Sequence, residues 1–303
     1  MRFFVGVTDG GWFGFLKDRP ELQEINFWQP GARGFRAIPP GGLFLFKLKS
    51  PINAIAGGAF LQDARVLPLS LAWDAFGAGN GVADLSALRR SIARYREGVR
   101  LTDAIGCVML RDPFYFERRD YIPAPEDWHR SIVSGKTYST DDPTGQELWK
   151  QVQLRTTARA VMERRNQESA MYGEPTLVRP RLGQAGFRVA VTETYRRQCA
   201  VTGERVLPVL DAAHILPVSE GGVHRVDNGL LLRKDIHRLF DLGYVTVTPG
   251  RHAFRVSSRL QDEFDNGEHY RRFQSQTVWL PERSEDRPRD DLLEWHGDTV
   301  FQP

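Results

Sequence analysis

Four residues in the second half of the chain have side chains and spacings that could do chemistry. His214 ends the apolar stretch 210–214, Asn228 follows in a segment with loop-like composition, and His237 and Asp241 lie four residues apart. On a helix, residues four apart leave the same face, so the last two side chains would point in one direction. Imidazole and carboxylate groups transfer protons and bind divalent ions near neutral pH. These residues therefore predict a polar site built by a strand, a loop and a short helix.

The order of these residues is more specific than any one of them. A single histidine after an apolar strand is usually structural, and a His-x-x-x-Asp pair is often an ordinary surface pair. The sequence around His214 reads Ala-Ala-His-Ile-Leu-Pro, and from His237 it reads His-Arg-Leu-Phe-Asp-Leu-Gly. From about Phe187 to the C-terminus the chain resembles the HNH nuclease family, in the branch with "AAHI.P" and "H..FD.G" signatures.

The resemblance implies a ββα-metal fold and a role for each residue. His214 would be the general base that deprotonates water, and Asn228 would fix the loop between strand and helix. His237 would be a catalytic metal ligand, and Asp241 could be a second ligand. One divalent ion per active site is implied, with Mg²⁺ or Mn²⁺ the expected choice and other divalent ions possible.

One position departs from the family pattern. Many HNH sites place a ligand directly before the base, where this chain has Ala213, and Asp211 on the same strand face is the expected substitute. The two cysteines, Cys107 and Cys199, cannot form the paired CxxC motifs of a zinc ribbon, so no structural zinc is expected. The remaining histidines lack comparable settings and are not expected to be ligands: His129, His224, His252, His269 and His296.

Basic residues outnumber acidic ones between Lys150 and Arg205, although the net charge of the whole chain is only +3. This local excess, mostly arginine, predicts a surface that binds DNA phosphates. Arg196, Arg197 and Arg238 are the expected phosphate contacts. The alternative is a solvated helix face with plain salt bridges.

Hydrophobic patterning predicts the elements around these residues. Strands are expected at 43–49, 52–60 and 104–110, with a bulge or close approach at Gly57 and Gly58. Helices are expected at 86–97, 146–172 and 187–197, and a loop at 131–143. The fold class is α+β, with domains expected at 1–135, a basic helical linker at 136–185 and a nuclease domain at 186–303.

Segments of the first domain resemble the PUA-like superfamily, especially EVE-type domains. They are the aromatic segment 8–13, Asn-Phe-Trp-Gln-Pro at 26–30 and Pro-Gly-Gly-Leu-Phe-Leu-Phe at 40–46. The resemblance implies a curved β-barrel with flanking helices that reads modified bases in DNA. A flipped base needs aromatic faces and polar groups for its edge. Candidates for this pocket are Trp12, Trp28, Trp73, Asp9, Asn26 and Gln29, while the alternative places the aromatic rings in the core.

Together these features predict a modification-dependent DNA endonuclease that acts in defence against phage or foreign DNA. Its partner would be double-stranded DNA, and two copies would have to act together to break both strands. No apolar run of membrane-spanning length and no signal peptide occur, so a cytoplasmic location is expected. Two alternatives stay open: an endonuclease indifferent to modification, and a nucleic-acid-binding protein with an inert HNH site. Recognition of phosphorothioate DNA is a third, less favoured reading.

Overall fold

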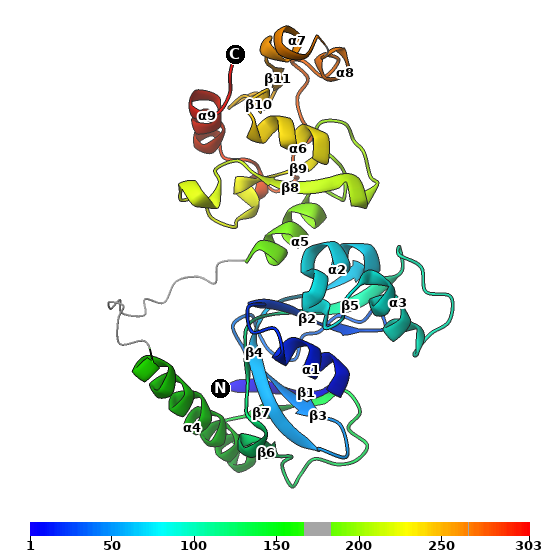
Figure 1. The fold of residues 1–303 in the computed structure, drawn as a ribbon, viewed down its shortest axis with the longest axis vertical. Helices are drawn as coiled ribbons and strands as arrows, with labels where there is room; N and C mark the ends of the chain where they lie inside the picture. The colour runs from blue at the N-terminus through cyan, green and yellow to red at the C-terminus, as the bar shows by residue number, and fades with distance from the viewer. Residues whose placement is uncertain (167–182, 266) are drawn as a thin grey trace. The chain divides into compact units, whose positions relative to one another are not determined.

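The computed structural model describes residues 1–166, 183–265 and 267–303 and divides the chain into two compact units, Met1–Pro180 and Arg181–Pro303 (Figure 1). The α+β class predicted from the sequence is confirmed, because each unit combines a sheet with helices.

In the described ranges, no helix has the length and apolar character that crossing a membrane requires.

A mixed seven-stranded sheet forms the centre of the first unit. The strand order is β2-β5-β4-β3-β1-β7, and β6 pairs with β4. β1 and β3 are parallel, and the other pairings are antiparallel. The strands are β1 (Arg2–Thr8), β2 (Glu24–Gln29), β3 (Leu43–Leu48), β4 (Ala54–Pro68), β5 (Ala104–Tyr115), β6 (Ile122–Pro123) and β7 (Gly135–Ser139).

Helices flank this sheet. They are α1 (Gly10–Lys17), α2 (Leu69–Phe76), α3 (Leu85–Ala93) and α4 (Pro143–Asn166). α1 and β2 contribute to one hydrophobic cluster with β3 and β4, which includes Trp12, Phe44 and Phe46. Leu148 and Val152 of α4 belong to a second cluster with Phe3 of β1, and Figure 1 shows α4 running beside β7. The first half of α4 is thus part of the first unit's core.

The structure tests the strands and helices that patterning predicts. The strands at 43–49, 52–60 and 104–110 are confirmed as β3, β4 and β5, although β4 and β5 extend further. The close approach at the glycine pair is also confirmed, because a Cβ on Gly57 would lie 2.2 Å from the Phe114 carbonyl oxygen. α3 ends at Ala93, earlier than the predicted 97. α4 begins at Pro143, and the predicted end at 172 lies outside the described residues.

The loop predicted at 131–143 is wrong over its centre, where β7 pairs antiparallel with β1. β7 is the last strand of the sheet order, and Tyr138 is its one buried side chain. An edge strand with one buried residue has little hydrophobic pattern, so its sequence resembles a loop.

The second unit is built around a strand pair followed by a helix. β8 (Leu210–His214) pairs antiparallel with β9 (Gly229–Arg233), and α6 (Lys234–Asp241) follows directly. α5 (Gln184–Thr194) precedes them and begins three residues before the predicted start at 187. The remaining elements are β10 (Val245–Val247), β11 (Phe254–Val256), α7 (Arg259–Phe264), α8 (Glu268–Arg271) and α9 (Asp290–Thr299).

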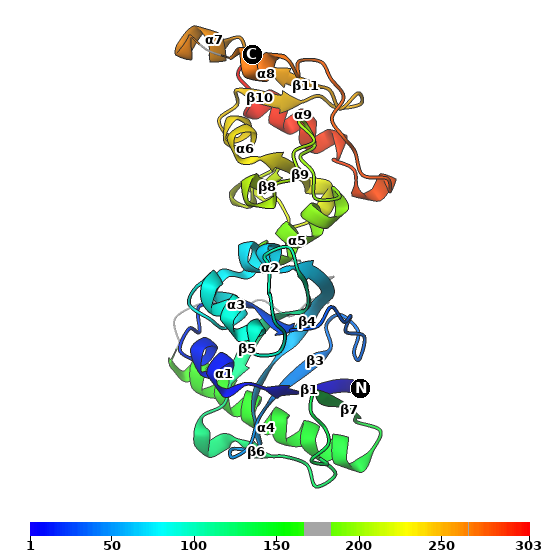
Figure 2. The same cartoon turned by 90° about the vertical axis from the view of Figure 1, so that its right-hand side faces the viewer.

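One hydrophobic core joins these elements. It includes Phe187 of α5, Leu231 of β9, Phe240 of α6, Phe254 of β11 and Leu293 of α9. α6 contacts β8, β9 and β10, and α9 contacts β10, an arrangement that can be followed in Figure 2. The strand, loop and helix setting predicted for His214, Asn228 and His237 is therefore present.

Candidate active site and aromatic cavity

His214, His237 and Asp241 line one pocket of about 530 Å³ in the second unit. His214 is the last residue of β8, and the other two leave α6 one turn apart, as predicted. Two further histidines, His224 and His296, line the same pocket. The site thus contains four imidazoles and a carboxylate.

His214 is held on one ring face and at one ring nitrogen. Its ring stacks on Phe187 with centroids 3.9 Å apart and an interplanar angle of 13°. Its Nε2 lies 3.0 Å from Nδ1 of His224. Burial, together with the charges of His224 and His237, lowers the pKa of His214 to about 4. The imidazole is therefore neutral at physiological pH and can accept a proton.

Asn228 lies in a 3₁₀ turn before β9 and is almost wholly buried. Its Oδ1 accepts a hydrogen bond from the Leu216 N–H at 2.9 Å, and its Nδ2 donates to the carbonyls of Leu216 and Val223, both at 3.0 Å. The Asn228 carbonyl accepts from the Ile215 N–H at 3.0 Å. One amide thus closes the loop between β8 and β9 at both ends, next to His214 and next to His224.

His237 is contacted by carboxylates on both edges of its ring. Nδ1 lies 3.1 Å from Oδ2 of Asp211, and Nε2 lies 3.5 Å from Oδ2 of Asp241. Asp211 also pairs with Arg188 of α5. Burial would raise the pKa of Asp211, but the hydrogen bond from His237 and the charge of Arg188 hold it below its ordinary value.

These contacts bear on the role predicted for Asp211, which was expected to be a metal ligand. The two nitrogens of an imidazole face opposite directions, so an ion on Nε2 of His237 would lie on the other side of the ring from this carboxylate. Asp211 lies where it can accept the Nδ1–H of His237, a common arrangement behind metal-binding histidines. His237 Nε2 and Asp241 remain as the neighbouring donor pair.

The donor pair fits a divalent cation that keeps waters and takes phosphate oxygens, as Mg²⁺ does. Burial raises the pKa of Asp241 against the charges of His237 and Arg238, and a bound cation would favour the ionised carboxylate. Within residues 1–166, 183–265 and 267–303, no group of three or more histidine, cysteine or acidic side chains is arranged to hold a metal ion.

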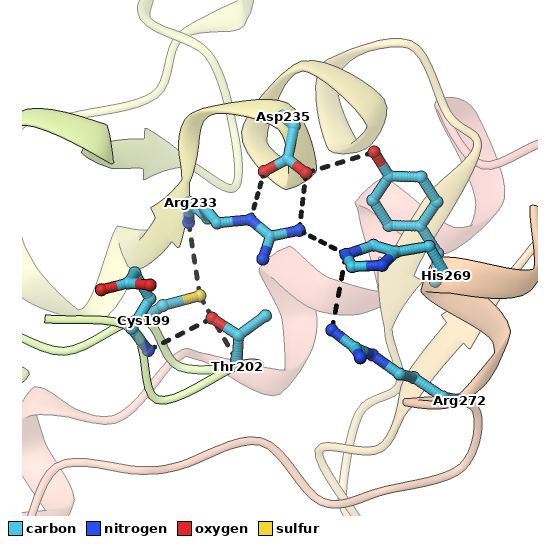
Figure 3. A network of polar contacts seen from close by, with 8 residues as sticks. Cys199, Thr202, Arg233, Asp235, His269 and Arg272 are labelled. Atoms are coloured by element: carbon cyan, nitrogen blue, oxygen red, sulfur yellow. Dashed lines mark hydrogen bonds and ion pairs between the residues drawn. The ribbon is translucent and has the colours of Figure 1, made fainter. Parts of the chain in front are cut away.

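A polar network fixes the start of α6 (Figure 3). The Arg233 guanidinium, at the helix N-cap, donates to both carboxylate oxygens of Asp235 at 2.7 Å. The Tyr270 hydroxyl donates to the same carboxylate at 3.1 Å, and the Arg233 N–H donates to Sγ of Cys199 at 3.3 Å. This network therefore holds the start of the helix that carries His237.

The arginines predicted to contact phosphate have different surroundings. Arg197 pairs with Glu193 at 2.7 Å, and Arg196 pairs with Glu282 near the Trp279 ring. Arg238 is exposed on α6, beside His237. The basic stretch between Lys150 and Arg205 includes side chains outside the described residues, at 157–182, so the predicted phosphate surface stays a prediction there.

The first unit contains a cavity of about 740 Å³ with aromatic walls. Of the residues predicted for a base pocket, Asp9, Trp12, Trp28 and Gln29 line it. Phe15, Phe27 and Tyr95 add aromatic surface, and Lys49, Arg33 and Arg94 add positive charge.

Hydrogen bonds fix both tryptophans of the wall. The Trp12 Nε1–H donates to the Asn26 carbonyl at 3.3 Å, and the Trp28 Nε1–H donates to the Asn80 carbonyl at 3.1 Å. Trp28 lies on β2. Asp9 accepts hydrogen bonds from the Gly11 and Trp12 N–H groups and so caps α1.

Two of the predicted pocket residues do not line this cavity. Asn26 is completely buried, and its Nδ2 donates to Oδ1 of Asn80 at 2.9 Å, so it supports the wall from behind. Trp73 lies half-buried on α2, outside the cavity, because only the opposite face of that helix is packed in the core. Neither side chain can contact a base bound there.

His224 and His296 are pocket residues that the sequence did not predict, since neither was expected to be a ligand. His224 stands ten residues after His214, and Gly221 and Gly222 between them are a sequence signal for a tight turn. A Cβ on Gly222 would lie 1.9 Å from the Leu216 carbonyl oxygen, so the loop can close this tightly only with glycine there.

Comparison with known proteins supports the nuclease assignment of the second unit. Residues 199–248 match the family model HNH_2, which describes an HNH endonuclease. This match supports the predicted HNH resemblance over this segment and, with it, endonuclease activity. No curated protein matches the chain.

Solved structures similar to the first unit are those of ASCH from Zymomonas mobilis. The unmodified protein has 14% sequence identity and a TM-score of 0.35, and the match covers 48% of this chain and 94% of that one. A single-substitution mutant gives 14% identity and a TM-score of 0.33, covering 48% of this chain and 96% of that one. Likenesses at this level carry no argument about function.

Proposed function

We propose that this protein is a modification-dependent DNA endonuclease that cuts with the His214 pocket and recognises a modified base in the aromatic cavity. The observation that carries the proposal is the pocket itself, where a neutral His214 faces the His237–Asp241 pair. The biological role would be restriction of phage or foreign DNA that carries modified bases.

The chemistry follows from what each side chain can hold or accept. His214 is neutral and accepts a proton from the attacking water, with its ring kept in place by Phe187. Asn228 keeps the loop closed. Asp211 holds the Nδ1 edge of His237, so the Nε2 edge of that ring points away from Asp211. A divalent ion bound by His237 and Asp241 would supply charge relief on the phosphate. Arg238 is exposed beside them and is positioned to meet a DNA phosphate.

The cavity supports the recognition part of the proposal. A base flipped out of a duplex needs flat apolar surfaces for stacking, and Trp12, Trp28 and Phe27 provide them. Gln29 and Asp9 are polar side chains at the same cavity and suit contacts to the base edge. We assign the first unit to the PUA-like class of base readers on this basis, with a curved, barrel-like sheet.

Two active sites must act to break both strands of a duplex, because one HNH site cuts one strand. We therefore propose that the protein cuts as a homodimer, formed at least transiently on DNA. Sedimentation with and without DNA would show whether the second copy joins.

Recognition is tested by cutting matched duplexes that differ only in modification, in Mg²⁺ and separately in Mn²⁺. The duplexes are unmodified or carry 5-methylcytosine, 5-hydroxymethylcytosine, its glucosylated form, N6-methyladenine or phosphorothioate. Wild type should cut one modified duplex preferentially, and Trp28→Ala should lose that preference. Trp73→Ala is the matched control, because this tryptophan lies outside the cavity and should leave the preference unchanged.

The other outcomes point to different functions. Equal cutting of all duplexes would leave an endonuclease indifferent to modification. Binding of the metal without cutting of any duplex would leave a nucleic-acid-binding protein with an inert site. Gln29→Ala provides a second test of the cavity if Trp28→Ala is destabilised by the loss of its hydrogen bond to Asn80.

A further inference from the structure

We infer that His224 is a positioning residue for the base His214: it accepts the Nε2–H of His214, so that Nδ1 carries the free lone pair that takes a proton from water. This inference rests on the proposed nuclease function and assigns a part in it to a residue that the HNH signature does not include. It is argued from the contact between the two rings, the loop that brings them together and the polar groups that surround them.

The two imidazoles form a direct hydrogen bond, with Nε2 of His214 3.0 Å from Nδ1 of His224. A hydrogen bond between two neutral imidazoles needs one N–H and one lone pair, so only two arrangements exist. If His214 donates, its Nδ1 is unprotonated and can act as a base. If His224 donates, Nδ1 of His214 carries the proton and cannot accept another.

The surroundings of His214 determine why the direction of this hydrogen bond matters. Its ring is stacked on Phe187 on one side, and His224 occupies its Nε2 edge. Nδ1 is the ring nitrogen that remains for water. A base that must work through Nδ1 therefore needs a partner that accepts at Nε2, and the His224 ring supplies that acceptor.

The loop between β8 and β9 is built so that these rings meet. Asn228 ties the backbone at Leu216, two residues after His214, to the backbone at Val223, one residue before His224. The Gly222 N–H donates to the Pro217 carbonyl at 2.9 Å and closes the turn between them. The contact between the two histidines is thus fixed by backbone hydrogen bonds on both sides, and the Phe187 ring lies against both.

The titratable groups that face the pair come from three other parts of the unit. His237 and Asp241 face it from α6, and His296 faces it from α9. Asp211 and Arg188 form an ion pair behind His237. Both ring nitrogens of His296 already have hydrogen-bond partners. Its Nδ1 accepts from the Thr246 hydroxyl at 2.9 Å, and its Nε2 donates to the Phe240 carbonyl at 3.1 Å. Among the described residues lining this pocket, His224 is the one whose ring meets His214 in a hydrogen bond.

The proton transfer from water to His214 balances with His224 as the hydrogen-bond acceptor and with solvent. The water oxygen forms a bond to phosphorus as the bond from phosphorus to the leaving oxygen breaks. One water proton moves to Nδ1 of His214, which becomes an imidazolium whose Nε2–H remains hydrogen-bonded to His224. The leaving oxygen takes a proton from solvent, and His214 later returns its own proton to solvent.

Substitutions at position 224 separate positioning from packing. His224→Ala removes the acceptor and should slow cutting by about 10- to 100-fold, by analogy with the loss of a partner that orients a metal-binding histidine. His224→Asn keeps an acceptor oxygen near the place of Nδ1 and should cut within about threefold of wild type. His224→Leu fills the space without an acceptor and should behave as the alanine variant does. Cutting at the wild-type rate by the alanine or leucine variant would overturn the inference, as would an asparagine variant as slow as alanine.

The tautomer of His214 can be read directly, without DNA and without activity. In protein labelled with ¹⁵N-histidine, long-range ¹⁵N–¹H spectra distinguish Nε2–H from Nδ1–H, and the His214 signals are those missing in His214→Ala. We expect the Nε2–H tautomer in wild type and in His224→Asn, and a mixture in His224→Ala. A wild-type protein with the proton on Nδ1 of His214 would overturn the inference even if the protein is an active nuclease. An inactive protein with the expected tautomer would instead count against the proposed function alone.

Discussion

Asn228 provides the sharpest test of how the loop supports the base. Asn228→Ala removes three hydrogen bonds to the backbone, two to Leu216 and one to Val223. Each such bond contributes about 0.5–1.5 kcal/mol, and the side chain is almost wholly buried, so its backbone partners lose their bonds without full access to water. We therefore expect the second unit to lose about 2–4 kcal/mol of stability, as estimated from these three bonds.

Hydrogen exchange in β8 and β9 measures this loss in the second unit separately from the first. A loss of that size corresponds to exchange on the order of 10²-fold faster, since about 1.4 kcal/mol is a factor of ten. Cutting should fall on the order of 10²-fold as well, because misplacing a catalytic group by about 1 Å has effects of this size.

Tyr195→Phe is the control for stability. It removes one buried hydrogen bond, from the Tyr195 hydroxyl to the Gly229 carbonyl, and leaves the three Asn228 side-chain bonds intact. It should weaken the unit and leave cutting near the wild-type rate. Asn228→Ala protein that is destabilised but cuts at the wild-type rate would refute the idea that loop closure positions His214.

Three further predictions test the surroundings of the site. Gly229→Ala places a Cβ 2.6 Å from Val191 and 3.0 Å from the Phe187 ring. This overpacking should lower the stability of the second unit by about 1–3 kcal/mol. It should also displace Phe187 from His214 and so slow cutting. Gly297→Ala is its control, because the added Cβ meets open space on α9, and equal rates for the two variants would argue against a role for Phe187. Asp211→Asn should raise the Mn²⁺ concentration for half-maximal cutting by about 10- to 100-fold, since Asp211 orients His237. Asp262→Asn, at an exposed position, is the control and should not change this concentration. An unchanged Mn²⁺ requirement in Asp211→Asn would contradict the role of Asp211. Burial lowers the pKa of His296 from 6.5 to about 4, so between these pH values the unfolded chain binds a proton that the folded chain does not, and stability in urea should fall as pH drops from 6.5 towards 4. His296→Gln should remove part of this dependence of stability on pH, and His214 should supply the rest. An unaltered dependence would show that His296 is not the group responsible.

Local pattern was enough to predict the central elements of the site. The apolar run that ends at His214 is β8, and the four-residue spacing of His237 and Asp241 belongs to α6, because strand and helix periods appear directly in the sequence. The resemblance to HNH nucleases, and not local pattern, implied that Asn228 fixes the loop, and its side chain does hydrogen-bond the loop backbone.

Contacts between segments far apart in the chain could not be predicted in the same way. His224 reaches His214 only because Asn228 and Gly222 close the loop between them. Asp211 was expected to bind metal, and the structure pairs its carboxylate with Arg188 from α5 and with the Nδ1 edge of His237. These outcomes depend on tertiary packing, which hydrophobic period does not encode.

The first unit shows the same limit. Trp28 precedes Gln-Pro-Gly and so resembles a loop residue, yet β2 pairs with β5 along its whole length and includes it. Asn26 has a polar side chain that suits a base edge, but Asn80 from the segment after α2 takes its hydrogen bond inside the core. Asn26 and Trp28 lie two residues apart on β2, yet only Trp28 lines the cavity, and only the fold reveals this difference.

Cutting of a modified duplex by wild type, His214→Ala and His129→Ala in Mg²⁺ and in Mn²⁺ tests the central claim most directly. His129 is an exposed histidine of the first unit that hydrogen-bonds Ser131, so its removal controls for the loss of an imidazole as such. We predict that wild type and His129→Ala cut at equal initial rates and that His214→Ala does not cut. Cutting by His214→Ala at the wild-type rate would contradict the assignment of this pocket as the nuclease site.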